Sequence, residues 1–195
     1  MRLLITGFGP FPGFPKNPSM ALARTLVADL RLKRAGIQAS ICLLPTIYAG
    51  LGDLIARNVD ETRPQAVLML GVASRRRHLS VEVRAVNRAS RLHPDAAGQL
   101  PTEGRLAIAG VACRAGRAPF AQIVAAGNAA GIRTKISRNA GAYLCNASYW
   151  HMLGTLPADT PCFFLHIPKI RSISGGRNLV NATRAAALLL ARRRS

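Results

Sequence analysis

The hydrophobic and polar positions of this chain follow two periods, which predicts that strands and helices alternate along it. Short apolar runs that end at Gly, Pro or polar residues are typical of buried strands, and apolar residues three or four apart are typical of helices packed on one side. The runs predict strands at residues 2–6, 37–44, 66–70, 80–87, 133–136 and 162–167. Helical patterns start at Pro18, cover 51–59 and 120–130, and start again near Tyr143 and Asn178.

This alternation predicts an α/β fold, specifically a single-domain α/β/α sandwich with a largely parallel central sheet. The chain has 195 residues, of which 49% are hydrophobic, so it is long enough to bury one full core. We see no internal repeat and no linker that would divide it. Residues 1–195 are therefore expected to form one domain.

The first predicted helix has a clear beginning. Asn17 can cap its N-terminus, and Pro18 suits the first helical position because that position needs no N–H donor. Leu22, Leu26 and Leu30 then fall on one face, which indicates that a single helix continues as far as Leu30.

The segment 80–87 alternates with a period of two, which predicts a half-buried strand. Val81, Val83 and Ala85 would share the inner face, and Glu82 and Arg84 the outer one. The following residues, 88–105, are rich in Pro, Gly and polar groups and predict a long loop of the kind that often carries function.

The apolar runs are all too short to cross a membrane. The first is interrupted by Gly and Pro, and the run AAALLLA at 185–191 is far below the roughly 18 apolar residues that a span needs. We therefore expect a soluble, cytoplasmic protein with no membrane partner.

The cysteines favour neither a metal site nor a disulfide scaffold. Cys42, Cys113, Cys145 and Cys162 are far apart and show no CxxC spacing. Each is expected to be a reduced thiol, and Cys42 and Cys162 lie in apolar runs typical of packing residues. No metal is expected.

The charge balance is strongly basic: 27 Lys and Arg residues face 8 acidic ones, for a net charge of +19. The clusters at 75–77 and 192–194 could form a surface for a polyanion. The arginines are spread over the whole chain, however, and no basic run is interleaved with aromatic residues. This distribution favours salt-sensitive, non-specific association, and we expect no specific nucleic-acid partner.

Three residues far apart in the sequence could perform nucleophilic chemistry together. Cys145 precedes a helical pattern, so its thiol would lie at a helix N-terminus, where the dipole favours a thiolate and free N–H groups can hold an oxyanion. His166 ends an apolar strand, and Glu82 is one of only three glutamates. Taken singly, each is more often structural: a packing cysteine, a hydrogen-bonded histidine, a salt-bridge partner. Together they match a nucleophile, a base and a group that orients the base.

Longer motifs in the same order give the chain a family resemblance. They are LLITGFGPFPGFPKNPS at the first strand, LLPT at 43–46, LSVEVRAVN around Glu82, PD at 94–95, NAGAYLCN around Cys145 and FFLHIP around His166. In these motifs the chain resembles the pyrrolidone carboxyl peptidases, or pyroglutamyl peptidase I, which are cysteine peptidases that remove N-terminal pyroglutamate from peptides.

The resemblance implies a role for each matching residue. Cys145 would be the nucleophile, His166 the general base and acid, and Glu82 the carboxylate that orients the imidazole. The expected substrate-binding residues are Phe8 and Phe11, which would enclose the lactam ring, and Thr46, Tyr143 and Leu144, which would line the same pocket. No cofactor is implied, and the family commonly forms homo-oligomers.

Three places depart from the family pattern. Gly9 stands where the family usually has an acidic residue, and VASRRR at 72–77 stands where it usually has a glycine-bearing segment. The third departure is in the long loop. Where the family has ARIPD, this chain has Arg91, Leu92, His93, Pro94 and Asp95, so the arginine lies one place earlier and a histidine replaces an apolar residue. We expect Arg91 and His93 to be substrate contacts. Three interpretations follow: an active pyroglutamyl peptidase, a paralogue that acts on or binds another small acyl amide, and a polyanion-binding protein that reuses the fold.

Overall fold

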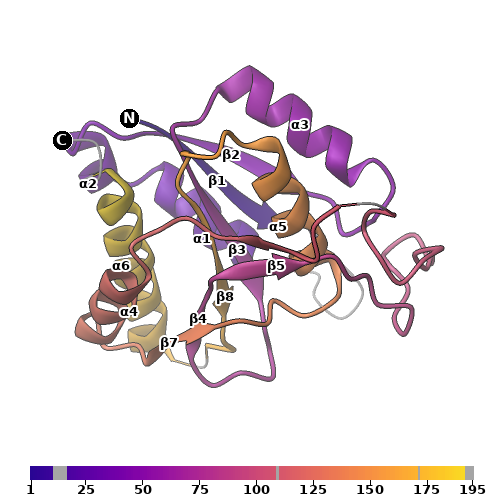
Figure 1. The fold of residues 1–195 in the computed structure, drawn as a ribbon. Helices are drawn as coiled ribbons and strands as arrows, with labels where there is room; N and C mark the ends of the chain where they lie inside the picture. Colours follow the sequence, from indigo (N-terminus) through magenta and orange to yellow (C-terminus); the bar gives the residue numbers. More distant parts are fainter. Residues whose placement is uncertain (11–16, 109, 171, 192–195) are drawn as a thin grey trace.

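The computed structural model describes residues 1–10, 17–108, 110–170 and 172–191, and it shows a three-layer α/β/α arrangement (Figure 1). The central sheet has the strand order β2-β1-β3-β8-β4-β7. Its strands are β1 (Arg2–Phe8), β2 (Gln38–Leu44), β3 (Ala66–Val72), β4 (Leu79–Glu82), β7 (Thr134–Ser137) and β8 (Cys162–Ile167). The pairs β1–β2, β1–β3, β3–β8 and β4–β7 are parallel, and only β4–β8 is antiparallel. The predicted α/β fold with a largely parallel sheet is confirmed.

Helices cover both faces of this sheet. They are α1 (Pro18–Val27), α2 (Leu30–Arg34), α3 (Leu51–Thr62), α4 (Phe120–Ala129), α5 (Leu144–Thr155) and α6 (Ile173–Ala191). One face packs against α1, α2, α4 and α6 through one buried apolar cluster, and the other packs against α3 and α5 through a second. In Figure 1, α4 and α6 lie side by side on one side of the sheet, and α3 and α5 lie together on the other.

The first helix begins as predicted but ends earlier. The Asn17 side chain accepts a hydrogen bond from the backbone N–H of Ser19, so it caps α1. The helix stops after Val27, and Asp29 caps a separate short helix, α2. Leu30, at the start of α2, is 62% exposed and does not share the buried face of Leu22, so the prediction of one continuous helix is wrong.

The segment predicted as one half-buried strand is two strands in two sheets. β4 ends at Glu82 and is buried along its whole length between β8 and β7. The chain leaves the sheet at Val83, whose N–H donates to the carbonyl of Ser137, and continues as β5 (Arg84–Val86). β5 pairs with β6 (Cys113–Ala115), a strand that the sequence patterns do not indicate, in a separate antiparallel sheet.

The direction of β4 determines which loops lie at the edge of the sheet where β3 and β8 end. β3 and β8 run the same way, so their carboxyl ends lie at one edge of the sheet. Because β4 is antiparallel to β8, the loop 73–78 between β3 and β4 remains at that edge. The long loop predicted at 88–105 is present and continues to β6. In the residues that the structure describes, no helix is long and apolar enough to span a bilayer.

Candidate active site

Cys145 is the second residue of α5, as the sequence pattern predicts. The helix begins at Leu144, and Tyr143 precedes it in extended conformation. N–H groups in the first turn of a helix have no acceptor within the helix, so those of Leu144 and Cys145 are free to bind an anion. The side chain of Asn146 fixes this helix end, because its amide exchanges hydrogen bonds with the N–H and C=O of Val86 and also donates to the carbonyl of Arg88.

Gly71 brings the thiol of Cys145 against the sheet next to His166. Gly71 is the register partner of His166 on the neighbouring strand. A Cβ at position 71 would lie 3.0 Å from the Cys145 sulfur and 2.6 Å from the Phe164 ring. The ring of Phe164 in turn lies 4.8 Å from that of His166, centroid to centroid. The thiol therefore occupies space that any side chain at position 71 would fill, on the face of the sheet that carries the His166 imidazole.

His166 and Glu82 form a buried pair. The Nδ1 atom of His166 lies 2.8 Å from the Oε1 atom of Glu82, and both side chains are almost completely buried. The register places Glu82 diagonally across from His166 on the adjacent strand, within reach of a long side chain. A carboxylate only accepts hydrogen bonds, so Nδ1 carries the imidazole proton and Nε2 is left free to act as a base.

The sequence patterns did not single out Arg76 as a partner of this pair. Its Nη1 atom lies 2.6 Å from Oε1 of Glu82, the oxygen that also receives His166. The sequence marks 75–77 only as a basic cluster, and nothing in that pattern distinguishes the middle arginine from its neighbours. Ser137, opposite Glu82 on β7, completes the surroundings of the carboxylate.

The pKa of Glu82 is lowered. Burial alone would raise it, but the hydrogen bond and charge of His166, together with the Arg76 guanidinium, outweigh burial. Glu82 is therefore ionised in the folded protein at neutral pH.

The pKa of the Cys145 thiol is shifted in the opposite direction, upward. Burial raises its pKa to about 12, the charge of Glu82 adds to this rise, and Arg76 only partly offsets it. A thiol whose pKa is raised needs a base to take its proton when it reacts.

A small pocket opens at the thiol. It has a volume of about 100 Å³ and is lined mostly by apolar surface. Its lining residues are Phe8, Asn17, Thr46, Val72, Tyr143, Leu144 and Cys145. The structure thus brings together Phe8, Thr46, Tyr143 and Leu144, all of which the sequence motifs indicated, and it adds Asn17 and Val72. The pocket lies at the carboxyl ends of β1, β2 and β3, where α/β sheets usually bind ligands.

The long loop is fixed to the pocket wall through its PD motif. The Tyr143 hydroxyl donates to the carbonyl of Pro94. Asp95 accepts hydrogen bonds from the backbone N–H groups of Tyr48, Ala97 and Gln99. These contacts hold the middle of the loop against the pocket.

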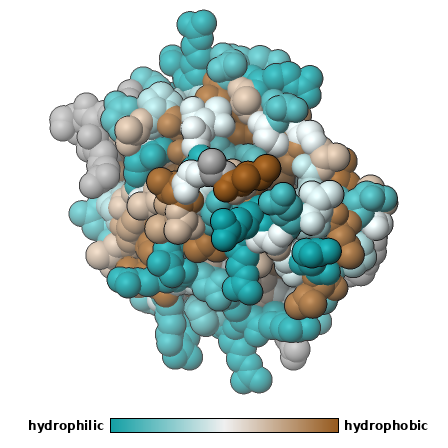
Figure 2. Space-filling model, turned by 45° about the vertical axis from the view of Figure 1, so that its right-hand side comes forward, coloured by the Kyte–Doolittle hydropathy of each residue, from teal (hydrophilic) through white to brown (hydrophobic). Residues whose placement is uncertain are grey.

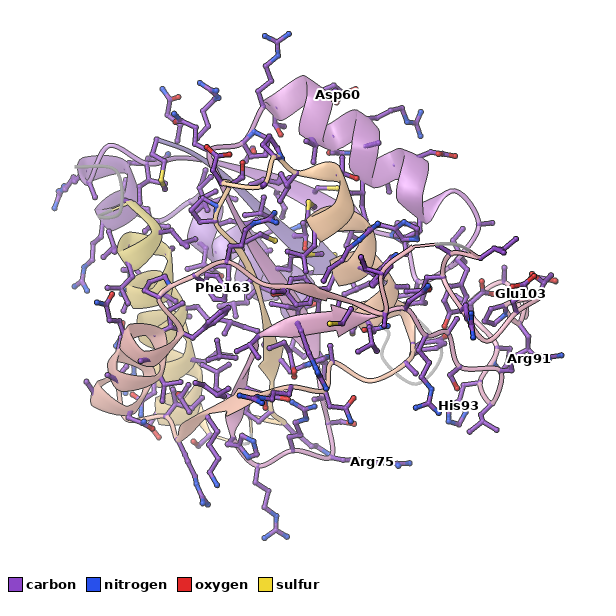
Figure 3. The ribbon with its side chains drawn as sticks, in the orientation of Figure 1. Asp60, Arg75, Arg91, His93, Glu103 and Phe163 are labelled. Atoms are coloured by element: carbon purple, nitrogen blue, oxygen red, sulfur yellow. The ribbon has the colours of Figure 1, made fainter. Side chains whose placement is uncertain are left out.

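The other residues that the resemblance selected in this region are placed differently. Arg91 and His93 are both exposed, neither lines the pocket, and Figure 3 shows Arg91 extending away from the molecule at the outer edge of the loop. Phe11 lies outside the described residues. Figure 2 shows a largely hydrophilic surface on this side, with hydrophobic residues in small groups.

The remaining cysteines lie apart from this site. Cys42 and Cys162 are buried free thiols, as predicted, and Cys113 is exposed on β6. The described part of the chain holds no group of three or more His, Cys, Asp or Glu residues that could bind a metal ion.

An α/β sandwich with a thiol at a helix N-terminus, near an imidazole held by a carboxylate, is the arrangement that cysteine hydrolases use. Comparison with known proteins makes this class specific. A family model described as pyroglutamyl peptidase matches residues 1–182. The chain therefore belongs to the pyroglutamyl peptidase family of cysteine peptidases, as its motifs predict.

Individual relatives agree with the family model. A pyrrolidone-carboxylate peptidase of Gloeobacter violaceus is 36% identical over 170 residues, which cover 86% of this chain and 82% of the relative. A pyrrolidone-carboxylate peptidase of Thermococcus onnurineus is 32% identical over 173 residues, which cover 87% of this chain and 84% of the relative.

Solved structures show the same fold. The crystal structure of pyrrolidone carboxyl peptidase from Thermus thermophilus has a TM-score of 0.85 and 30% identity, covering 96% of this chain and 99% of that one. A mutant pyrrolidone carboxyl peptidase from P. furiosus reaches a TM-score of 0.90 with 100% of both chains covered, and at 23% identity it supports the fold alone.

Proposed function

We propose that this chain removes an N-terminal pyroglutamyl residue from peptides, with Cys145 as nucleophile, His166 as general base and acid, and Glu82 as the group that orients His166. The observation that carries the proposal is the small apolar pocket with the Cys145 thiol in its wall, together with the buried His166–Glu82 pair at the same edge of the sheet.

The first half of the reaction forms an acyl-enzyme. As the Cys145 sulfur attacks the pyroglutamyl carbonyl carbon, the thiol proton passes to Nε2 of His166. The Glu82 carboxylate stabilises the imidazolium, and the N–H groups at the start of α5 receive the negative oxygen. His166 then gives the proton to the peptide nitrogen, the C–N bond breaks, and the shortened peptide leaves with a free amine.

The second half of the reaction reverses these roles. His166 takes a proton from water, whose oxygen attacks the thioester carbonyl. The C–S bond breaks, the Cys145 sulfur takes back its proton from His166, and pyroglutamate is released. Because burial raises the pKa of the Cys145 thiol, the proposed transfer of its proton to His166 accompanies the attack of the sulfur on the carbonyl.

The pocket suits the neutral lactam ring. A pyroglutamyl residue has no charged amine, so its ring is bound best by apolar surface with a few polar groups. Phe8, Val72 and Leu144 provide the apolar surface, and Thr46 and Asn17 provide the polar groups. The proposed contacts of Phe11, Arg91 and His93 come from the family motifs alone.

Steady-state hydrolysis of a pyroglutamyl fluorogenic amide tests the proposal. Wild-type protein should release the fluorophore, and Cys145→Ala should reduce turnover to background, because the substitution removes the proposed nucleophile. A prolyl amide of the same fluorophore is the matched control, since its ring carries a charged amine. Wild-type turnover no higher than that of Cys145→Ala would reject the proposal in favour of a paralogue with another substrate.

The location and the assembly of the enzyme are also part of the proposal. We infer a cytoplasmic enzyme, since a reducing compartment would keep its four free cysteines as thiols. We also infer a homo-oligomer, because the long loop exposes large apolar side chains at Leu92, Ile108 and Val111. Sedimentation velocity over a range of protein concentrations tests the assembly, and a monomer at all concentrations would reject it.

A further inference from the structure

Arg76 differs from the two arginines beside it. Arg75 and Arg77 are exposed, and Figure 3 shows Arg75 pointing away from the molecule into solvent. The Arg76 side chain is only 26% exposed and turns toward the buried carboxylate of Glu82. Three consecutive residues of one type therefore offer a natural comparison, in which only the middle one contacts the site.

The guanidinium of Arg76 joins two segments of the active site. Its Nη1 atom donates to Oε1 of Glu82 at 2.6 Å and to the Ser137 hydroxyl at 3.3 Å. Its Nη2 atom donates to the backbone carbonyl of Asn139 at 2.6 Å. Asn139 lies in the loop that leads from β7 to α5, the helix that carries Cys145. One planar group thus links the carboxylate of β4 to the approach of the nucleophile helix.

The backbone of the same loop is anchored beside His166. The N–H of Arg76 donates to the carbonyl of Ala73, and the N–H of Ala73 donates to the carbonyl of Ile167. Ile167 follows His166 on β8. The loop that presents the guanidinium is therefore held next to the strand that presents the imidazole.

Glu82 needs a fixed cation. Its carboxylate is fully buried, and Oε1 receives both Arg76 and His166. Among the described residues, Oε2 has no hydrogen-bond partner. Burial favours the protonated, uncharged form of this carboxylate, and the groups that oppose protonation are His166, the Ser137 hydroxyl and Arg76. His166 cannot supply a constant charge, because it gains and loses its proton during the reaction.

We propose that Arg76 is a positioning residue for the reaction, which keeps the Glu82 carboxylate charged and aimed at His166 and ties it to the loop before Cys145. The inference rests on the proposed function for the reaction itself, whereas the state of Glu82 can be measured without any substrate.

The other charged groups around Glu82 come from every neighbouring element. The titratable groups whose charges act on Glu82 or on its partners are His166 on β8, His78 in the β3–β4 loop, Cys145 and Tyr149 on α5, and Lys135 on β7. Lys135 and Arg133 act mainly on His78, whose pKa is lowered by burial and by these cations. Arg76 is the only permanent cation with a salt bridge to Glu82 among the described residues.

The first measurement is the titration of Glu82 itself. The chain has only three glutamates, so selective carbon-13 labelling of glutamate carboxyl groups gives a simple spectrum, in which Glu82→Gln identifies the Glu82 signal. In Arg76→Met the pKa of Glu82 should rise by about one unit, because a nearby opposite charge is lost. Arg75→Met and Arg77→Met remove the same charge from the same loop and should leave the Glu82 titration at its wild-type position.

The second measurement is the pH profile of pyroglutamyl amide hydrolysis. In Arg76→Met, kcat/KM should fall about ten- to a hundredfold as the carboxylate loses its alignment. The acidic limb of the profile should also move to higher pH, because the loss of a nearby positive charge favours protonation of the coupled Glu82–His166 pair. Arg76→Lys keeps the charge but not the planar guanidinium with its several donors. Its acidic limb should therefore stay near that of wild type while kcat falls. The two outer variants should match wild type in both respects.

Several results would overturn the inference. If Arg76→Met folds, and its Glu82 titration and acidic limb are the same as those of Arg75→Met, then Arg76 has no positioning role. If Arg76→Met does not fold, Arg76→Gln takes its place, since it keeps a polar side chain without the charge, and the same shift is required of it. If wild-type protein does not hydrolyse the amide, the proposed function fails, and the glutamate titration alone still decides whether Arg76 holds Glu82 in its charged form.

Discussion

At the scale of single residues, the space above Gly71 decides where the nucleophile sits. A Cβ there would lie 2.6 Å from the Phe164 ring and 3.0 Å from the Cys145 sulfur, closer than real side chains approach. The missing side chain is therefore what allows the thiol to lie against β3, next to the register position of His166.

Gly71→Ala should consequently damage both activity and stability. We expect kcat for the pyroglutamyl amide to fall at least tenfold, because the sulfur is displaced, and the free energy of unfolding to fall by about 1–3 kcal/mol from overpacking. Gly176→Ala is the control, since a Cβ there meets nothing within 4 Å and the site lies in α6. Enzyme assays and urea unfolding check both, and a Gly71→Ala protein with full activity would contradict this account of the site.

The charge of Glu82 also predicts a pH dependence of stability. Burial raises the pKa of Glu82, but His166, the hydrogen bond of Ser137 and the charge of Arg76 together bring it below its ordinary value of 4.5 in the folded protein. Below pH 4.5 the unfolded chain therefore binds more protons at this position than the folded one. The stabilisation is complete above pH 4.5 and is lost as the pH falls through the lower, folded-state pKa.

Comparison with Glu82→Gln isolates this contribution. The difference in unfolding free energy between wild type and variant should be largest near neutral pH and should shrink from pH 4.5 downward. Asp29 and Asp95, whose pKa values are also lowered, contribute equally to both proteins. Urea titrations between pH 7 and pH 3 provide the measurement, and a difference that is constant across this range would refute the assignment.

At the scale of elements, the start of α1 couples helix capping to the pocket. The Oδ1 atom of Asn17 accepts hydrogen bonds from the N–H and the hydroxyl of Ser19, while its Nδ2 donates to the carbonyl of Gly9. Asn17 also lines the pocket. One side chain therefore stabilises the helix with its oxygen and holds the loop after β1 with its nitrogen.

Two substitutions should separate these tasks. Asn17→Ser keeps a neutral capping oxygen and loses the amide donor to Gly9, so KM should rise while most of the capping stability remains. Asn17→Ala loses both and should also cost about 1 kcal/mol of unfolding free energy. Thermal unfolding and steady-state kinetics of the pair test this, and equal loss of stability in the two variants would show that the oxygen does not cap the helix.

The sequence predicts helices and strands best where the residue pattern is compatible with only one structure. The run 162–167 is apolar and ends at a proline, so the strand and the place of His166 follow directly. The segment after Ser80 alternates in the same way whether it forms one strand or two. The backbone hydrogen bonds that divert it at Val83, to Ser137 and from Gly116, join residues far apart in the chain and leave no local signal.

The site shows the same limit. The motifs identify Cys145, His166 and Glu82, and the structure brings Glu82 and His166 into contact and the Cys145 thiol to the strand position beside His166. The role of Arg76 could not be read in advance, because its two neighbours are identical to it in sequence. Only the path of the loop 73–78, which is hydrogen-bonded to Ile167 at the end of β8, turns the middle arginine toward Glu82.

At the scale of the whole molecule, most of the positive charge has no partner. The net charge is +19, and among the described residues only Arg76 and Arg184 have a carboxylate within 4 Å of their guanidinium nitrogens. The remaining described Lys and Arg side chains repel one another through solvent. Such repulsion destabilises a compact state more than an expanded one, because folding brings the charges together.

Salt should therefore stabilise this protein. At about 0.01 M ionic strength charges interact over roughly 30 Å, a distance comparable to the molecule, and at about 0.1 M over roughly 10 Å. Raising NaCl from the lower to the higher value should increase Tm by about 2–4 °C, which corresponds to roughly 1 kcal/mol for a chain of this size. Equal ionic strengths of NaCl and KCl should act alike if screening is the cause. A Tm that stays constant or falls over this range would mean that the positive charge is already compensated in the folded protein.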